Sequence, residues 1–243
     1  MALHYSFSGK KVLVTGGGRG IGRAVVQKLY DDDAKIYILE KDAELIQQVQ
    51  KELPKATAVC VDVCDWKATR EAILKFGPLD HLVNNAGVLA PQEFMDLTEQ
   101  VVELHMAVNF KAMINVTQSV AKGMIESGNG GSIVNMSSLA GHLTVPGICS
   151  YSCTKAAVIM LTKSMALELG KHKIRANSVS PTGAATIMAT LLPEAAGAVI
   201  GRAVDPRPVL PEEIADTILF LLSPKAGMIT GEDVTIDSGV RTC

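Results

Sequence analysis

The chain has 243 residues, 48% of them hydrophobic and 20% charged, with 23 basic and 25 acidic side chains and a formal net charge of −2. This composition is typical of a globular protein that is long enough to bury a sizeable core without a metal ion or disulfides. Because the charge is balanced and no apolar run approaches the roughly 20 residues that span a bilayer, we expect neither nucleic acid nor a membrane as a partner.

Short apolar runs rich in β-branched residues alternate with helical patterns along the whole chain. The predicted strands are Lys11–Thr15, Lys35–Glu40, Thr57–Asp62, Asp80–Asn85, Ser132–Ser137, Lys173–Ser180 and Asp233–Asp237. The predicted helices are Ile21–Tyr30, Ala43–Leu53, Trp66–Lys75, Glu99–Glu126, Tyr151–Leu169 and Pro211–Leu222. Strands that are apolar on both faces and are separated by helices are typical of parallel sheets. We therefore predict an α/β fold, a doubly wound Rossmann sheet of seven mostly parallel strands with helices on both faces, as a single domain over residues 1–243.

A glycine-rich turn, Thr15 to Gly22, joins the first predicted strand to the first predicted helix. Glycines permit a positive φ and a close approach of the backbone to a phosphate, and the following helix N-terminus offers unpaired N–H groups. The turn reads T-G-x-x-x-G-x-G and not the common G-x-G-x-x-G, since Ile21 stands where the last glycine would be. Its place between strand and helix favours a pyrophosphate site over a merely tight connection.

The second predicted strand ends in Glu40, about twenty residues beyond the turn. A carboxylate there accepts hydrogen bonds from the hydroxyls of an adenosine ribose and repels a 2′-phosphate. Arg19 and Lys41 are cations that could instead hold a 2′-phosphate, or could be solvated surface charges. The balance favours NAD(H) slightly and leaves NADP(H) open.

The five cysteines, Cys60, Cys64, Cys149, Cys153 and Cys243, are odd in number, which suits reduced thiols. The first four form two pairs, and the two cysteines of each pair are four residues apart. Each pair could be half of a metal site, but no His or Cys pair at zinc-finger spacing accompanies them. We therefore expect no metal. The first ten residues lack the apolar stretch of a secretory signal, so we expect a cytoplasmic protein.

Tyr151 and Lys155 lie one helical turn apart at the start of a predicted helix. An ammonium near a phenol favours the phenolate, so we expect a lowered pKa for Tyr151 and a role in proton transfer. Ser137 and Ser138 follow the fifth predicted strand, at the carboxyl edge where ligands bind to open α/β sheets. A surface pair of tyrosine and lysine is the alternative.

Residues 181–210 form the one long irregular stretch, rich in Ala, Gly, Thr and Pro. Loops of this length inside an α/β domain are usually functional. We predict a substrate-binding loop or lid over these residues, with a poorly ordered insertion as the alternative.

These motifs, in this order, resemble those of the short-chain dehydrogenase/reductase family over essentially the whole chain. The matching residues are Thr15–Gly22, Asp62, Asn84–Gly87, Asn109, Ser138, Tyr151, Lys155, Pro181 and Thr186. Ser138 is preferred to Ser137 because it precedes the tyrosine by 13 positions, as is usual in the family. The resemblance implies an NAD(P)-dependent oxidoreductase that interconverts a ketone or diketone and a secondary alcohol, and it implies a homo-oligomer, usually a tetramer.

The resemblance also assigns roles to individual residues. Tyr151 would be the acid and base, Ser138 would bind the reacting oxygen, Lys155 would bind the nicotinamide ribose and Asn109 would anchor a water. The catalytic residues implied are Asn109, Ser138, Tyr151 and Lys155. The cofactor-binding residues implied are Gly16, Arg19, Gly20, Ile21, Gly22, Glu40, Lys41, Asp62, Val63, Asn85, Ala86, Gly87, Tyr151, Lys155, Pro181 and Thr186.

Within the family the chain resembles the branch of dicarbonyl/L-xylulose reductases, for example at Cys60–Asp62, Met165–Gly170 and the terminal Cys243. It departs from that branch at Glu40, and at Leu139 and Ile148, where a sugar pocket would be polar. The expected substrate-binding residues are Ser138, Leu139, His142, Ile148 and Tyr151. An apolar lining favours an apolar ketone or diketone over a polyol.

Two other functions stay open at this point. One is a dehydrogenase of an apolar hydroxy compound such as a hydroxysteroid, and the other is a non-catalytic member of the fold that binds a dinucleotide. A serine hydrolase is excluded because the sequence has no G-x-S-x-G motif.

Overall fold

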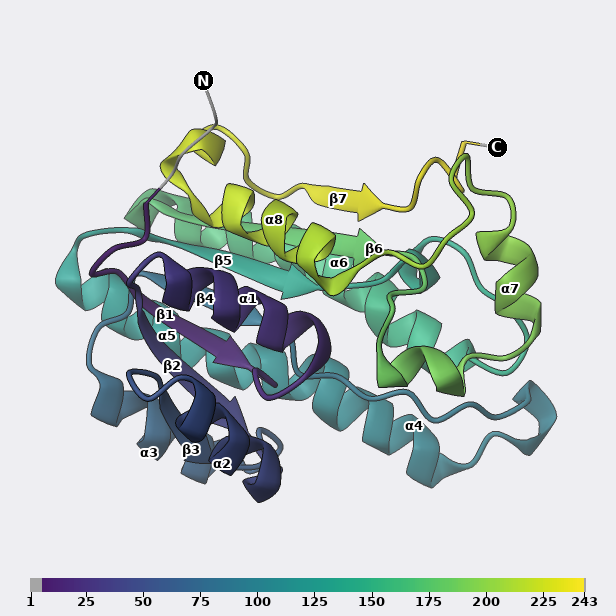
Figure 1. Ribbon diagram of the computed structural model, residues 1–243, viewed down its shortest axis with the longest axis horizontal. Coiled ribbons are helices and arrows are strands. Elements are labelled where there is room, and N and C mark those ends of the chain that lie inside the picture. The colour runs from purple at the N-terminus through teal and green to yellow at the C-terminus, as the bar shows by residue number, and fades with distance from the viewer. Residues whose placement is uncertain (1–5, 243) are drawn as a thin grey trace.

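The computed structural model describes residues 6–242, and its centre is one sheet of seven strands (Figure 1). The strands are β1 (Lys11–Thr15), β2 (Lys35–Glu40), β3 (Thr57–Cys60), β4 (His81–Asn84), β5 (Gly131–Met136), β6 (Ile174–Pro181) and β7 (Asp233–Ile236). Their order is β3-β2-β1-β4-β5-β6-β7, and every neighbouring pair is parallel. The doubly wound Rossmann sheet predicted from the sequence is confirmed.

Helices cover both faces of this sheet. They are α1 (Gly20–Asp31), α2 (Ala43–Glu52), α3 (Trp66–Phe76), α4 (Glu99–Met106), α5 (Ala112–Ser127), α6 (Cys149–Leu169), α7 (Ala195–Ile200) and α8 (Pro211–Leu222). Side chains of α1, α2 and α8 share one core cluster with β1 and β2, while α3, α5 and α6 share the cluster on the opposite face. In Figure 1, α1 and α8 lie in front of the sheet and α5 behind it.

The apolar runs explain this arrangement. Val12, Leu13 and Val14 of β1 are each 0% exposed, and they alternate between the two core clusters. A strand that is buried on both faces needs a helix layer on each side. β1 is accordingly an interior strand of the sheet, hydrogen-bonded to β2 on one side and to β4 on the other.

The helix predicted over Glu99–Glu126 contains a feature that the hydrophobic pattern does not reveal. Between α4 and α5 the chain forms a π-helical turn over Ala107–Lys111, with buried Asn109 inside it. A π turn is defined by i→i+5 hydrogen bonds in place of the i→i+4 bonds of an α-helix, and a count of hydrophobic residues does not report these bonds. Single π turns of this kind are frequent at functional sites.

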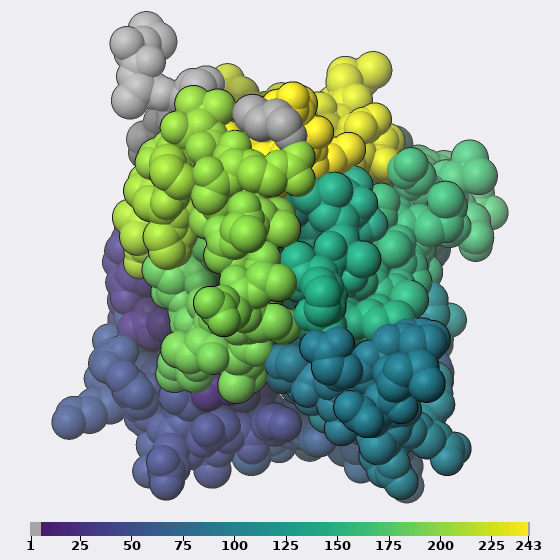
Figure 2. Space-filling model, turned by 90° about the vertical axis from the view of Figure 1, so that its right-hand side faces the viewer, coloured from purple at the N-terminus to yellow at the C-terminus, as the bar shows by residue number. Residues whose placement is uncertain are grey.

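The long irregular stretch has more structure than expected. A 3-10 turn covers Ile187–Leu191, helix α7 covers Ala195–Ile200, and an isolated bridge joins Ala184 to Val209. Its backbone is also tied to the C-terminal segment, since the Val204 N–H donates to the Ser238 carbonyl oxygen. Figure 2 views the carboxyl end of the strands, and this green segment covers a large part of that face.

Membrane-spanning helices, metal-ligand groups and cysteine pairing can be considered for the described residues. Within residues 6–242 no helix has the length and apolarity needed to span a bilayer. No group of three or more potential metal ligands was found in the same range. Cys60, Cys64, Cys149 and Cys153 are free thiols, while Cys243 lies outside the described residues.

His81, at the first position of β4, is a partly buried imidazole remote from the carboxyl edge. The hydroxyl of Ser132 donates to the Leu222 carbonyl oxygen, so the His81 Nδ1, 2.7 Å from that hydroxyl oxygen, is the donor of their bond. Burial lowers the pKa of His81 from 6.5 to about 4. The unfolded chain therefore takes up this proton at a higher pH than the folded chain does.

We expect the neutral His81 ring to make stability depend on pH in mild acid. Its contribution is complete above about pH 6.5 and is lost as the pH falls through about 4, by up to about 3 kcal/mol. Urea unfolding of His81→Phe and of the unchanged protein at pH 7 and pH 4.5 measures this. The variant should lose less free energy of unfolding over that range, and equal losses would contradict the assignment.

Candidate active site

The carboxyl ends of β4, β5 and β6 bring the predicted catalytic residues into one region. Asn109 comes from the π turn, Ser138 follows β5, and Tyr151 and Lys155 lie in the first two turns of α6. All but Ser138 are buried, with exposures of 0% for Asn109, 8% for Tyr151 and 4% for Lys155. Ligands bind at this edge of doubly wound sheets.

Tyr151 and Lys155 face each other across one helical turn. The Lys155 Nζ lies 5.5 Å from the centre of the Tyr151 ring and donates a hydrogen bond of 2.8 Å to the Met136 carbonyl oxygen at the end of β5. Ser137 donates its hydroxyl to the Lys155 carbonyl oxygen at 2.8 Å, which fixes the helix against the strand. Of the two adjacent serines, Ser137 is thus a structural link and Ser138 forms the hydrogen bond to the Tyr151 hydroxyl.

The structure corrects one expectation about this pair. Burial raises the pKa of Tyr151 to about 12, and the hydrogen bond with Ser138 opposes that rise. Burial also lowers the pKa of Lys155 to about 8. Desolvation of each group outweighs the effect of the ammonium on the phenol, because the Nζ lies beside the ring and bonds to a carbonyl oxygen. The phenol is therefore held in its protonated form, ready to donate.

Asn109 connects the chain that leaves β4 to helix α6. Its Oδ1 accepts from the Val88 N–H at 2.8 Å, its Nδ2 donates to the Val88 carbonyl oxygen at 3.0 Å, and Nδ2 also reaches the Thr154 hydroxyl at 3.4 Å. Gly87 lies between the two sides, because a Cβ added there would lie 3.4 Å from the Asn109 Oδ1 and 3.8 Å from the Lys155 Nζ. The Asn109 side chain and the Lys155 ammonium thus lie close to the same backbone segment, at Gly87 and Val88.

The glycine turn is packed so closely that side chains cannot replace its hydrogens. A Cβ added at Gly22 would lie 2.2 Å from the Gly16 carbonyl oxygen and 2.5 Å from the Asn85 Nδ2. Gly16 and Gly20 have φ values of +66° and +57°, which glycine adopts readily. The turn is held from β4, since the Thr15 hydroxyl accepts from the N–H groups of Asn85 and Ala86, at 3.0 Å each.

The same turn has the features of a phosphate site. Arg19 is the N-cap of α1 and supplies no side-chain hydrogen bond to the helix, so the first N–H groups of α1, at Gly20 to Gly22, lack a side-chain cap. Uncapped N–H groups and the positive end of the helix dipole are what a pyrophosphate requires. The residues present therefore fit the pyrophosphate of a dinucleotide.

Glu40 lies where the adenosine ribose is expected. Its Oε2 accepts from the Gly18 N–H at 3.3 Å, and its Oε1 accepts from the N–H groups of Lys41 and Asp42 at 2.9 and 3.3 Å. The carboxylate is thereby held against the glycine turn. Arg19, in the glycine turn, and Lys41, directly after β2, are both exposed.

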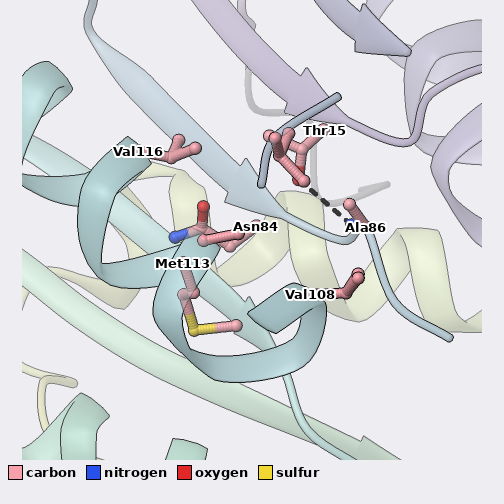
Figure 3. A pocket seen from close by; sticks show the side chains of 8 residues that line it. Thr15, Asn84, Ala86, Val108, Met113 and Val116 are labelled. Atoms are coloured by element: carbon pink, nitrogen blue, oxygen red, sulfur yellow. Dashed lines mark hydrogen bonds between the residues drawn. The ribbon is translucent and has the colours of Figure 1, made fainter. Parts of the chain in front are cut away.

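A small cavity of about 10 Å³ lies between the ends of β1 and β4, the π turn and α5 (Figure 3). It is lined by Thr15, Val63, Asn84, Ala86, Val108, Ala112, Met113 and Val116. Val63 is 8% exposed, whereas Asp62 is exposed and its Oδ1 accepts from the Cys64 N–H at 2.9 Å. Within residues 6–242 the Asn84 Oδ1 is the one buried side-chain oxygen or nitrogen without a hydrogen bond.

The irregular stretch reaches over the glycine turn. A Cβ added at Gly20 would lie 3.3 Å from the Thr186 Cγ2, so Thr186 lies directly beside the proposed pyrophosphate site. Pro181 is the buried last residue of β6 and pairs with Ile236 of β7. The fold thus brings Thr186 to the glycine turn, although the two are far apart in the sequence.

The predicted substrate residues divide into two groups. Ile148 packs with Tyr151 and Leu89 in a small apolar cluster, against which Ala140, Val145, Met188 and Leu192 also pack. Leu139 is buried, at 5% exposure. His142 instead contacts β7, where its Nε2 lies 2.6 Å from the Asp233 Oδ2, and Asp233 also accepts from Ser178 and Ser180. Sequence reasoning did not find Met188 and Leu192, because apolar residues in an irregular stretch carry no periodicity.

Comparison with known proteins identifies the family. Residues 10–196 match the family described as short chain dehydrogenase. The chain belongs to this family. It is 42% identical to carbonyl reductase [NADPH] 2 of Sus scrofa, with 98% of each chain covered, and 43% identical to L-xylulose reductase of Mus musculus, with 96% of each covered. A solved short-chain type dehydrogenase/reductase from Mycobacterium marinum superimposes with a TM-score of 0.92 at 30% identity, covering 98% of this chain and 97% of the other.

This short-chain dehydrogenase is therefore an oxidoreductase of a family that uses NAD(P), and the resemblance to carbonyl and L-xylulose reductases is confirmed. The alternatives of a hydroxysteroid dehydrogenase and a non-catalytic binder are not favoured by these relatives.

We expect Gly22→Ala to weaken dinucleotide binding at least tenfold, because the added methyl cannot fit beneath the Gly16 carbonyl oxygen without opening the turn. Fluorescence titration with NADH and NADPH measures the dissociation constants. Gly170→Ala is the matched control, since no atom lies within 4 Å of a Cβ added there. Unchanged binding in Gly22→Ala would show that the turn is not part of the cofactor site.

Proposed function

We propose that this enzyme reduces the carbonyl of an apolar ketone or diketone, and reverses the reaction on the secondary alcohol, with Tyr151 as the acid and base. The observation that supports this most directly is the buried tyrosine at the carboxyl edge of the sheet, hydrogen-bonded to Ser138 and one turn from Lys155. A buried, protonated phenol is a suitable proton donor, and its position is fixed by a rigid helix.

The proposed roles of the other residues follow from their contacts. Ser138 hydrogen-bonds the Tyr151 hydroxyl, and the same Oγ can bind the reacting carbonyl oxygen as negative charge develops on it. When the substrate oxygen takes the Tyr151 proton, the resulting phenolate lies close to the Lys155 ammonium, which stabilises that charge. Asn109 fixes the backbone beside Lys155 and is proposed to hold the water that returns a proton. Bound nicotinamide would supply the hydride.

The proposed cofactor site extends along the carboxyl edge. Uncapped N–H groups of α1 would bind the pyrophosphate, and Glu40 would accept from the adenosine ribose. Lys155 would bind the other ribose. The remaining contacts are proposed for Gly16, Arg19, Gly20, Ile21, Gly22, Lys41, Asp62, Val63, Asn85, Ala86, Gly87, Tyr151, Pro181 and Thr186.

The apolar cluster around Tyr151 supports the proposed substrate class. Leu89, Ile148 and Tyr151 pack together, and Met188 and Leu192 reach the cluster from the irregular stretch. Sugar hydroxyls placed among such side chains would lose hydrogen bonds to water without replacement. We therefore propose that residues 181–210 form a lid of this single domain, and that the enclosed site accepts diketones better than pentuloses.

A substrate panel with Tyr151→Phe as its control tests this function. We expect the unchanged enzyme to reduce apolar diketones with a higher kcat/KM than pentuloses. Removing the hydroxyl of Tyr151 should lower kcat by a factor of about 10² to 10⁴, while dinucleotide binding remains. Turnover of Tyr151→Phe at the unchanged rate would refute the mechanism, and a clear preference for pentuloses would refute the substrate class.

For the cofactor we propose a preference for NAD(H). The Glu40 carboxylate, held against Gly18, would repel a 2′-phosphate and accept from ribose hydroxyls. Exposed Arg19 and Lys41 act in the opposite sense, and the name of the Sus scrofa relative specifies NADPH. The contribution of Glu40 therefore decides the preference.

We expect Glu40→Ser to raise kcat/KM for NADPH relative to NADH by at least tenfold, because it removes a negative charge from the place of the 2′-phosphate. Initial rates with both cofactors on one diketone measure the ratio. Glu44→Ser, at an exposed residue in the first turn of α2, serves as a charge-matched control. The role of Glu40 would be contradicted if the unchanged enzyme strongly preferred NADPH and if Glu40→Ser left the ratio of the two kcat/KM values unchanged.

We further propose a cytoplasmic homo-oligomer, with a tetramer expected from the family resemblance. The free thiols at Cys60, Cys64, Cys149 and Cys153 support a reducing compartment. Met160 and Leu167 of α6 are 62% and 84% exposed, which supports burial against another copy.

A further inference from the structure

His105, in the last turn of α4, is a buried imidazole that none of the assigned roles includes. It is 1% exposed and lies beside the catalytic tyrosine, with the two ring centres 5.9 Å apart in an edge-on arrangement. Burial, and then the charge of Lys155, lower its pKa, so the ring is neutral at pH 7.

The hydrogen bonds of His105 define its tautomer. The Ala90 backbone N–H, which can only donate, lies 3.0 Å from Nε2, so Nε2 is the acceptor. The proton of the neutral ring is therefore on Nδ1, which donates to the Ser150 hydroxyl oxygen at 2.7 Å. One ring thus joins the chain leaving β4 to the residue that immediately precedes Tyr151.

Asn109 makes the same kind of connection one turn further along. It joins Val88 to Thr154, the residue that immediately precedes Lys155. His105 and Asn109 are four residues apart, and so are Ser150 and Thr154. Two hydrogen-bonded bridges, one through His105 of α4 and one through Asn109 of the π turn, therefore connect residues 88–90 to the first two turns of α6.

We propose that His105 is a positioning residue for the reaction, which sets the place of Tyr151 as Asn109 sets that of Lys155. Its bond to Ser150 fixes the first turn of α6, and its bond to Ala90 fixes Leu89, which packs on the Tyr151 ring. A displacement of about 1 Å in a catalytic group can lower a rate about a hundredfold. The inference rests on the proposed role of Tyr151.

Substitution of His105 separates positioning from general stability. We expect His105→Phe, which keeps a ring and loses both hydrogen bonds, to lower kcat roughly ten- to a hundredfold, with little change in KM and in NADH affinity. His105→Gln can keep an acceptor for Ala90 and should recover part of kcat. Ser150→Ala, which removes one acceptor without altering the core, should lower kcat in the same sense and less than additively with His105→Gln.

His81→Phe is the matched control for these variants. His81 is a partly buried imidazole that also donates through Nδ1 to a serine and packs edge-on against an aromatic ring, Phe7, at 5.5 Å, but it lies at the opposite end of β4. We expect it to lower stability without changing kcat.

Three results would overturn the proposal. They are a kcat of folded His105→Phe within twofold of the unchanged enzyme, equal losses in His105→Phe and His105→Gln, and an unchanged kcat in Ser150→Ala. If His105→Phe does not fold, His105→Gln and Ser150→Ala decide the question. Full turnover by Tyr151→Phe would refute the proposed function instead, whereas an inactive Tyr151→Phe beside a fully active His105→Phe would refute only the positioning role.

Discussion

The hydrogen bonds that hold residues 85–90, where the chain leaves β4, organise the whole site. This segment carries little secondary structure, so its backbone groups need partners from elsewhere. Thr15 supplies them at Asn85 and Ala86, Asn109 at Val88, and His105 at Ala90. These bonds hold the glycine turn, the π turn and helix α6 against the same backbone segment, although the three are far apart in the sequence.

Burial of charged and polar groups sets the chemistry beside residues 85–90. A lysine at 4% exposure beside a tyrosine at 8% costs folding free energy, since burial forces each group toward its neutral form. Perturbed groups of this kind are concentrated at functional sites. The ammonium is satisfied by the Met136 carbonyl oxygen, and it becomes a counter-charge for the phenol only after that phenol has lost its proton.

The fold was largely predictable from the sequence, because short apolar runs typical of parallel strands alternate with helical patterns along the chain. Strand and helix ends differ from prediction by only a few residues, as for β3, which ends at Cys60 and not at Asp62. Motif positions such as Tyr151 and Lys155 were also predictable. The π turn and the bond between His142 and Asp233 were not, since each depends on the packing of distant segments. The sign of the Tyr151 pKa shift likewise depends on burial, which spacing along a helix does not report.

The contact of Thr186 with the glycine turn bears on the kinetics of a full catalytic cycle. The same stretch that lies over Gly20 supplies Met188 and Leu192 to the apolar cluster at Tyr151. If residues 181–210 act as the proposed lid, one opening movement would uncover both the proposed dinucleotide site and the apolar cluster at Tyr151. Departure of the alcohol and exchange of the spent cofactor would then be linked steps of the catalytic cycle.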